Sequence, residues 1–295
     1  MFTRLLVPLD GSAIAEKALP HARALGRILE IPITLLTVIE TADDFSKKGS
    51  AALDTLIEGG VGKSEQYLEK ISQTFSGAAI KYRVEKGRAE EAIIVNAAGD
   101  NGTLIAMATH GRSGLDRWLL GSITEKVVRD ANNPVLAVRV TADTSSEGEA
   151  AMGSILVPLD GSTLAESVLP YVIELAKAFD AKVTLLRSYH LKEMIFSFEK
   201  YHPDLDQVRG ALKWEAMSYL NEKVAELKSR GLVEICSSVS EGDAAQTIIE
   251  MGKATANTLI VMSPHSGSVL KRWVLGSVTE KVLRYSNSSV LTIRT

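Results

Sequence analysis

Leu6-Val7-Pro8-Leu9-Asp10-Gly11-Ser12 returns 150 positions later as Leu156-Val157-Pro158-Leu159-Asp160-Gly161-Ser162. Downstream, Trp118-Leu119-Leu120-Gly121-Ser122-Ile123-Thr124-Glu125-Lys126-Val127 is matched at an offset of 155 by Trp273-Val274-Leu275-Gly276-Ser277-Val278-Thr279-Glu280-Lys281-Val282. Solenoid repeats have periods of roughly 20–50 residues, so this much longer period indicates a duplicated domain. We predict a first domain over 1–142, a linker over 143–152 and a second domain over 153–295.

Within each half, β-type apolar runs alternate with helical segments. The first half has such runs at Arg4–Leu9, Ile33–Val38 and Thr103–Ala108. Helical stretches are predicted at about Ser12–Glu30, near Lys63–Phe75 and over Ala89–Ala98. Alternating strands and helices favour right-handed crossovers and a parallel sheet that is covered on both faces. The sequence therefore predicts an α/β fold of two tandem, five-stranded, parallel-sheet domains of Rossmann-like type.

Composition narrows the classes of function. The formal net charge of −3, without a long basic block, argues against a nucleic-acid partner. No apolar run approaches the roughly 20 residues that a membrane helix needs, and we expect no membrane association. The single cysteine, Cys236, excludes an intrachain disulfide and is expected to be a small buried hydrophobe. These features together predict a cytoplasmic protein.

Polar and glycine residues of the first half follow two strands that should end at the same edge of the sheet. Asp10 follows the first strand, while Gly111, Gly114 and Gly121-Ser122 follow the fourth. Ligands of open parallel sheets sit beyond the carboxyl ends of the strands. Glycines before a helix N-terminus let backbone N–H groups approach phosphate oxygens, and a nearby carboxylate suits ribose hydroxyls. The pattern predicts a nucleotide site here.

The segment from Ala108 to Ser122 resembles the phosphate-binding signature of the universal stress protein family. That signature is Gly, two residues, Gly, nine residues, Gly, then Ser or Thr. Gly111, the nine residues that follow it and Gly121-Ser122 match it, whereas Ala108 stands at the leading Gly. The turn at Asp10 also resembles the family, and Val38 corresponds to the valine that touches adenine in its ATP-binding members. The resemblance covers nearly the whole chain, twice.

The resemblance implies an adenine nucleotide alpha hydrolase-like fold, ATP as ligand with or without Mg²⁺, slow hydrolysis at most and a regulatory role in stress. It also implies intramolecular pairing of the two domains through their last strands, a homodimer and an unknown regulatory protein partner. No catalytic residue and no metal ligand is expected. The residues expected to bind the nucleotide are Pro8, Asp10, Val38, Ala108, His110, Gly111, Arg112, Gly114, Gly121, Ser122, Ile123 and Thr124.

The second half departs from this pattern. Ser263 and Ser266 stand where Ala108 and Gly111 stand in the first half, and Ser188 stands at Val38. The added Cβ atoms should crowd the phosphate path. We therefore expect the nucleotide mainly in domain 1. The second site is expected to be weak, and its candidate residues are Asp160, Ser266, Gly276 and Ser277. The alternative is that the second half binds a different ligand, with the hydroxyls of Ser263 and Ser266 as donors.

Several residues also have purely structural interpretations. Asp10, Ser12 and their repeats could cap helices, and Ser122 with Glu125, like Ser277 with Glu280, has the spacing of a capping box. Gly59–Ser64 imitates the end of a P-loop but lacks its first glycine and preceding strand. The alternative functions are a slow ATPase or nucleotidyl-transfer enzyme, and an interaction module without nucleotide. The absence of a positioned base or nucleophile favours binding over turnover.

Overall fold

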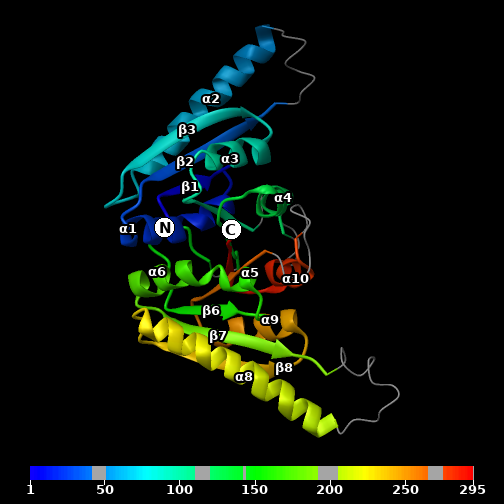
Figure 1. Ribbon diagram of the computed structural model, residues 1–295. Coiled ribbons are helices and arrows are strands. Elements are labelled where there is room, and N and C mark those ends of the chain that lie inside the picture. The colour runs from blue at the N-terminus through cyan, green and yellow to red at the C-terminus, as the bar shows by residue number, and fades with distance from the viewer. Residues whose placement is uncertain (42–50, 110–119, 142–143, 192–204, 265–274, 295) are drawn as a thin grey trace. The chain divides into compact units, whose positions relative to one another are not determined.

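The chain divides into two compact units, Met1–Ala151 (unit 1) and Met152–Ile293 (unit 2). The computed structural model describes residues 1–41, 51–109, 120–141, 144–191, 205–264 and 275–294. In both units strands and helices alternate along the chain (Figure 1). The elements of unit 1 are β1 (Arg4–Pro8), the 3-10 helix η1 (Ala15–Ala18), α1 (Leu19–Ile28), β2 (Ile33–Glu40), α2 (Ala51–Ser72), β3 (Ile80–Gly87), α3 (Ala89–Ala98), β4 (Thr103–Ala108), α4 (Ser122–Asp130) and β5 (Val135–Val138).

Unit 2 repeats this order of elements. They are β6 (Ser154–Pro158), α5 (Thr163–Glu166), α6 (Leu169–Phe179), β7 (Lys182–Tyr189), α8 (Leu205–Ser229), β8 (Ile235–Glu241), α9 (Ala244–Ala254), β9 (Thr258–Met262), α10 (Ser277–Tyr285) and β10 (Ser289–Thr292).

The strands of unit 1 run parallel in the order β3-β2-β1-β4-β5. Leu5 of β1 is in register with Ile33 of β2 and Leu104 of β4, so the three strands end at one edge. The chain moves outward from β1 to β2 and β3, then crosses back to β4. The switch point between β1 and β4 is where doubly wound sheets bind ligands.

Unit 2 has the equivalent order β8-β7-β6-β9-β10, and its described strand pairs are also parallel. Its switch point lies between β6 and β9. The prediction of two α/β domains, each with a five-stranded parallel sheet, is confirmed.

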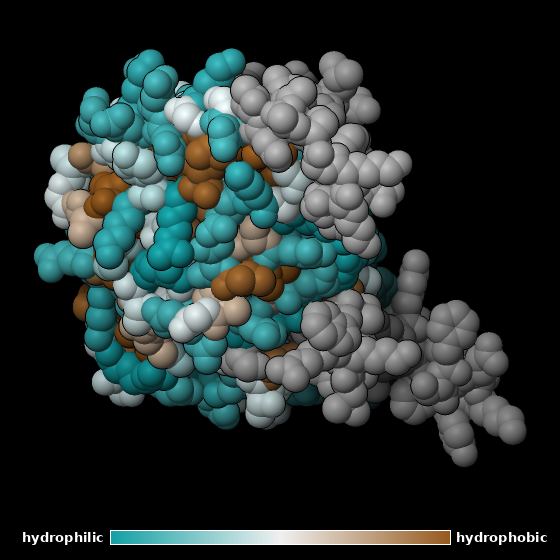
Figure 2. Space-filling model, turned by 90° about the horizontal axis from the view of Figure 1, so that it is seen from above, coloured by the Kyte–Doolittle hydropathy of each residue, from teal (hydrophilic) through white to brown (hydrophobic). Residues whose placement is uncertain are grey.

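The central strands are apolar because both faces of the sheet are covered. All six residues of β4 and the three middle residues of β1 are buried. Helix α2 packs on β2 and β3, while α3 packs against α4. Polar residues remain outside, and most of the coloured surface in Figure 2 is hydrophilic, with smaller hydrophobic areas between.

Three local predictions were wrong. The helix expected over 12–30 is divided into η1 and α1, with Pro20 in the first turn of α1. Neither capping box forms, because Gly121 and Gly276 are the extended N-cap residues and the serines after them are already helical. Cys236 is exposed rather than buried, because it lies on β8, the edge strand of the unit 2 sheet.

Residues 144–150, which we call the strap, lie along η1 and α1 within unit 1. The backbone N–H of Ala150 donates to the carbonyl oxygen of Pro20 at 3.0 Å. Three basic side chains hold the rest of the strap through its carbonyl oxygens and one carboxylate: Lys17 donates to Thr144, Arg23 to Ser146 and Gly148, and Arg27 to Glu149. The predicted linker is therefore, over this stretch, an ordered part of unit 1.

Candidate functional site

In unit 1 the ends of β1 and β2 are fastened to each other. The N–H of Leu9 donates to the carbonyl oxygen of Leu36 at 2.8 Å, and Thr37 Oγ1 donates to the carbonyl oxygen of Leu9 at 2.9 Å. These bonds place Pro8 and the turn at Asp10 beside the end of β2, where Val38 lies. Three of the residues expected at the nucleotide site thus come from adjacent strand ends.

The turn after β1 is built by local hydrogen bonds. Asp10 Oδ1 accepts from the N–H of Ser12 at 2.9 Å, and Ser12 Oγ accepts from the N–H of Ala15 at 3.1 Å. Gly11, with a φ of +75°, makes this sharp turn at a position where a Cβ would be strained. The hydroxyl of Ser12 therefore supports the chain just before η1, while the carboxylate of Asp10 shapes the turn.

The end of β4 is joined to the start of α4. Thr124 Oγ1 donates to the carbonyl oxygen of Ala108 at 2.9 Å. The N–H of Gly121 donates to the carbonyl oxygen of Thr109 at 2.5 Å. Ser122 and Ile123 form the first turn of α4. The first-turn N–H groups of this helix lack intrahelical partners, and together with the helix dipole they favour an anion.

Four expected site residues of unit 1, His110, Gly111, Arg112 and Gly114, lie outside the described residues, as does Ser266 of unit 2. Gly59–Ser64 lies inside α2, so the P-loop interpretation is excluded.

In unit 2 the equivalent residues surround a pocket of about 110 Å³ at the switch point. It is lined, among others, by Pro158, Asp160, Ser188, Ser263, Gly276 and Thr279. Through the two repeat offsets these correspond to Pro8, Asp10, Val38, Ala108, Gly121 and Thr124. Two of the four residues expected at the second site, Asp160 and Gly276, line the pocket, and Ser277 does not.

Apart from the hydroxyl of Ser263 as a donor to a different ligand, sequence reasoning named no role for Pro158, Ser188, Ser263 or Thr279 in a second site. The signal was nonetheless present, because projecting the first-half residues through the offsets of 150 and 155 finds all four.

The bonds that frame the pocket are the same in the two units. Thr279 Oγ1 donates to the carbonyl oxygen of Ser263 at 3.1 Å. The N–H of Gly276 donates to the carbonyl oxygen of Pro264 at 2.8 Å. Asp160 Oδ1 accepts from the N–H of Ser162 at 2.9 Å. The duplicated sequence therefore builds the same backbone frame twice.

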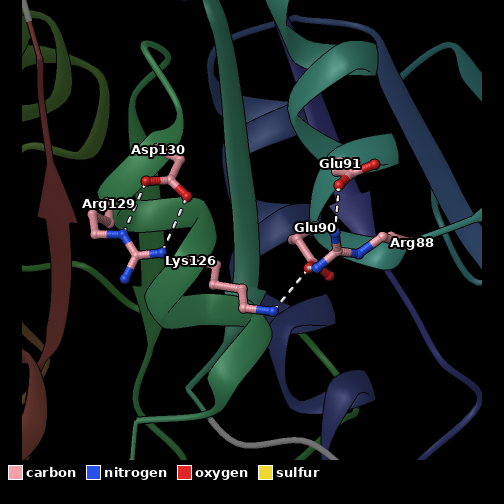
Figure 3. Close-up of polar contacts among 6 residues, drawn as sticks. All are labelled: Arg88, Glu90, Glu91, Lys126, Arg129 and Asp130. Atoms are coloured by element: carbon pink, nitrogen blue, oxygen red, sulfur yellow. Dashed lines mark hydrogen bonds and ion pairs between the residues drawn. The ribbon is translucent and has the colours of Figure 1, made fainter. Parts of the chain in front are cut away.

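A charged cluster in unit 1 connects α4 to α3 (Figure 3). The side chain of Glu90, 12% exposed, accepts from Lys126 Nζ at 2.8 Å and pairs with Arg88 at 3.0 Å. The hydrogen bond from Lys126 is the main reason that the pKa of Glu90 lies below its usual value. The cluster fixes the helix whose N-terminus faces the switch point.

A tyrosine–glutamate pair joins α2 to η1 in unit 1, and unit 2 repeats it between α8 and α5. Tyr67 of α2 donates to Glu16 at 3.1 Å, and Tyr219 of α8 donates to Glu166 at 2.8 Å. Burial is the main cause that raises the pKa of both tyrosines, and the neighbouring glutamate raises it further. Both tyrosines therefore stay protonated donors at neutral pH.

Within the described part of the chain, no three His, Cys, Asp or Glu side chains come together to hold a metal ion. No helix of the described residues has the length and apolar character needed to cross a membrane.

Two tandem doubly wound α/β units, one with a described pocket at its switch point, define the general class of the chain. The model of the universal stress protein family matches residues 1–139 and 152–294. The chain therefore belongs to the universal stress protein family, in a tandem form with two such domains.

Two relatives from one organism each match about half of this chain. Universal stress protein MJ0577 of Methanocaldococcus jannaschii is 30% identical over 155 residues, covering 47% of this chain and 96% of the relative. Universal stress protein MJ0531 of the same organism is 25% identical over 141 residues, covering 47% and 83%. The crystal structure of a universal stress protein from Archaeoglobus fulgidus covers 99% of this chain and 98% of its own, with a TM-score of 0.74 and 20% identity, and so shares the fold.

Proposed function

We propose that the chain is a regulatory stress-response protein that binds an adenine nucleotide at the switch point of unit 1, with little or no turnover. The observation that carries this proposal is the pocket of unit 2, because its walls are formed by the equivalents of six residues expected to bind ATP in unit 1. The same hydrogen-bonded frame exists at Asp10, Ala108 and Gly121.

The chemistry of the unit 1 residues suits a nucleotide. The carboxylate of Asp10 can accept hydrogen bonds from ribose hydroxyls, and Val38 offers an apolar contact for a base. The N-terminus of α4 supplies N–H donors for phosphate oxygens. We assign no described residue as a metal ligand. Mg²⁺ that accompanies ATP is commonly held through the phosphates of the nucleotide with few protein ligands.

Isothermal titration of the full chain with ATP tests the proposal. We expect Asp10→Ala to weaken ATP binding about tenfold or more, because a charge-assisted hydrogen bond contributes about 1.5–3 kcal/mol. Asp160→Ala is the matched control, since it removes the same local turn bond in unit 2 and should leave ATP affinity unchanged. Failure of the wild-type chain to bind ATP would exclude the proposal.

Turnover is measured in the same preparations. We expect a hydrolysis rate far below the enzyme range of about 1–10³ s⁻¹. A rate above about 1 s⁻¹ that disappears in Asp10→Ala would identify an enzyme instead.

A further inference from the structure

The outer edge of the unit 2 sheet differs from its counterpart in unit 1. Strand β8 lies at the end of the unit 2 order, beyond β7, and its outer side pairs with no strand of the described residues. An unpaired edge exposes backbone donors and acceptors that can pair with another strand. Natural proteins protect such edges with charged side chains, lysine above all. The side chains of each edge strand therefore show whether that edge is protected.

The edge of unit 1 is protected in this way and the edge of unit 2 is not. Strand β3 carries four charged side chains, Lys81, Arg83, Glu85 and Lys86. Strand β8 carries one, Glu241, whose carboxylate accepts from Arg209 at 3.1 Å. Through the offset of 155, Ser238 of β8 stands where Arg83 stands in β3. The backbone groups of the unit 2 edge therefore lie open to pairing.

The helix that packs on β8 also exposes apolar side chains. Helix α8 lies along β8 and β7 (Figure 1). On its surface Trp214 is 72% exposed and Met217 is 44% exposed. The offset of 152 that relates the tyrosines of the two tyrosine–glutamate pairs places Gly62 and Glu65 of α2 at these positions. Aromatic residues and methionine are enriched at protein interfaces, whereas glutamate is depleted. We call β8 together with Trp214 and Met217 the β8 edge.

A hydrogen bond shows how α8 lies along β8. Ser237 Oγ donates to Asn221 Oδ1 at 3.2 Å. Met217 lies one helical turn before Asn221 on the same side of α8. Because helix and strand run in opposite directions, Met217 lies about level with Ser238, the middle residue of β8. A single two-fold axis at this level would therefore relate both the strands and the helices of two copies.

Charges on α8 are arranged so that two copies of this surface attract each other. Asp206 and Lys228 lie 11 residues before and after Met217, about three helical turns, so the three residues share one side of the helix. Arg209 bonds the carboxylates of both Asp206 and Glu241, at 2.6 and 3.1 Å, and this cluster keeps a net negative charge. An antiparallel two-fold pair brings Lys228 of each copy to the cluster of the other, so the attraction occurs twice.

We propose that the β8 edge is a dimer interface in which two copies of this chain pair their β8 strands antiparallel about Ser238. The exposed apolar side chains of α8 pack against the partner, and Asp206 faces Lys228 of the partner subunit. The equivalent edge of unit 1 is excluded from such pairing, because Arg83 would lie opposite itself across the axis. The interface lies on the far side of β7 from the switch point of unit 2, so it does not depend on the proposed nucleotide function.

Sedimentation of the full chain tests the interface. We expect a dimer at about 50 μM, above the micromolar dissociation constants of weak interfaces. Ser238→Arg introduces the residue of unit 1 and places like charges opposite each other, so it should raise the dissociation constant of the dimer about 100-fold or more. Met217→Glu, which also carries the unit 1 residue, should raise it about tenfold or more. Arg83→Ser is the matched control in unit 1 and should leave the dimer unchanged.

A cross-link tests the register of the strands. In a Cys236→Ser background, mild oxidation of Ser238→Cys should join two copies by a disulfide. Residues directly opposite each other in an antiparallel pair have Cα atoms about 4.5–5.5 Å apart, which a disulfide can span. Arg83→Cys in the same background should remain uncross-linked in denaturing electrophoresis. Circular dichroism confirms that each variant is folded.

A wild-type chain that sediments as a monomer at the stated concentration overturns the proposal. A folded Ser238→Arg variant that dimerises as the wild type does also overturns it, because the dimer contact would then lie on another surface. The same holds if Ser238→Cys forms no more cross-linked dimer than Arg83→Cys does.

Discussion

Helix α1 of unit 1 and helix α6 of unit 2 occupy equivalent places in the two units, but they have diverged in different ways on their two faces. On the exposed face, Lys17, Arg23 and Arg27 in and before α1 hold the strap, and their counterparts in unit 2 are Ser167, Ile173 and Lys177. On the buried face, Gly26 has become Ala176 while its neighbour Ile33 has become Val183. In the core, the larger residue at one position is matched by a smaller residue at its neighbour, so the total side-chain volume is similar in the two units. On the exposed face, only unit 1 has the three basic side chains that bind the strap.

The largest expected effect on stability comes from placing the alanine of unit 2 at Gly26 while keeping Ile33 beside it. A Cβ added to Gly26 would lie 2.4 Å from Cδ1 and 2.9 Å from Cγ1 of Ile33. We expect Gly26→Ala to lower the free energy of unfolding of unit 1 by about 1–3 kcal/mol through overpacking. Hydrogen exchange of the α1 and β2 amides in the full chain measures this loss.

The double variant Gly26→Ala/Ile33→Val reproduces the pair found in unit 2 and serves as the control. It should recover most of the lost protection, giving a favourable coupling in a double-mutant cycle. Equal protection in Gly26→Ala and the wild type would mean that the two positions vary independently.

A smaller effect is expected at the cluster between α3 and α4, where unit 2 has Ala245 in place of Glu90. Glu90→Gln should lower the free energy of unfolding of unit 1 by about 1–2 kcal/mol at pH 7, because it removes a partly buried charged hydrogen bond. Since the pKa of Glu90 is lowered in the folded state, its contribution is complete above the unfolded value of about 4.3.

That contribution is lost as the pH falls through the lowered folded pKa, so the difference between Glu90→Gln and the wild type should vanish in acid. Hydrogen exchange of the α3 and α4 amides across this pH range measures the difference in stability between the variant and the wild type. Asp243→Asn is the matched control in unit 2, where Asp243 and Lys281 are 3.8 Å apart and both more than half exposed. A pH-independent difference would attribute the effect of Glu90 to packing rather than charge.

The smallest change in stability is expected at the strap. Arg23→Ile introduces the residue of unit 2 and removes the bonds of Arg23 to the carbonyl oxygens of Ser146 and Gly148, at 2.9 and 3.0 Å. The amide of Ala150, which donates to Pro20, should then exchange roughly tenfold faster, as for a loss of about 1.4 kcal/mol. The control Lys177→Ala in unit 2 should leave the exchange rate of the Ala150 amide unchanged. An unaltered rate in Arg23→Ile would show that Arg23 does not hold the strap.

These comparisons also show what the sequence could reveal. Helix α3 and strand β4 were predicted with their observed limits, because a short apolar run between clear breaks leaves little choice. Helix α1 was predicted to begin too early, since the pattern of apolar residues continues through the turn that separates η1 from it. The positions of Asp10, Ala108 and Gly121 at the strand ends follow from their place after predicted strands.

Contacts between distant residues were beyond the sequence. The small polar residues of 144–150 indicate a flexible linker, and nothing local shows that Lys17, 127 positions away from Thr144, holds their backbone. Likewise, the serines of the unit 2 pocket appeared as losses from a phosphate motif. The sequence raised the hydroxyl of Ser263 as a donor to a different ligand, but only the structure places Ser188 and Ser263 in the same cavity.

The strap has a consequence for anyone who cuts the chain to study one unit alone. A fragment that ends at residue 142 would keep Lys17, Arg23 and Arg27 but lose the carbonyl oxygens and the carboxylate that they bind. Three cations would then be exposed along η1 and α1, a surface that attracts phosphate groups without specificity. ATP titrated into that fragment would give a false signal, which a fragment ending at Ala151 should avoid.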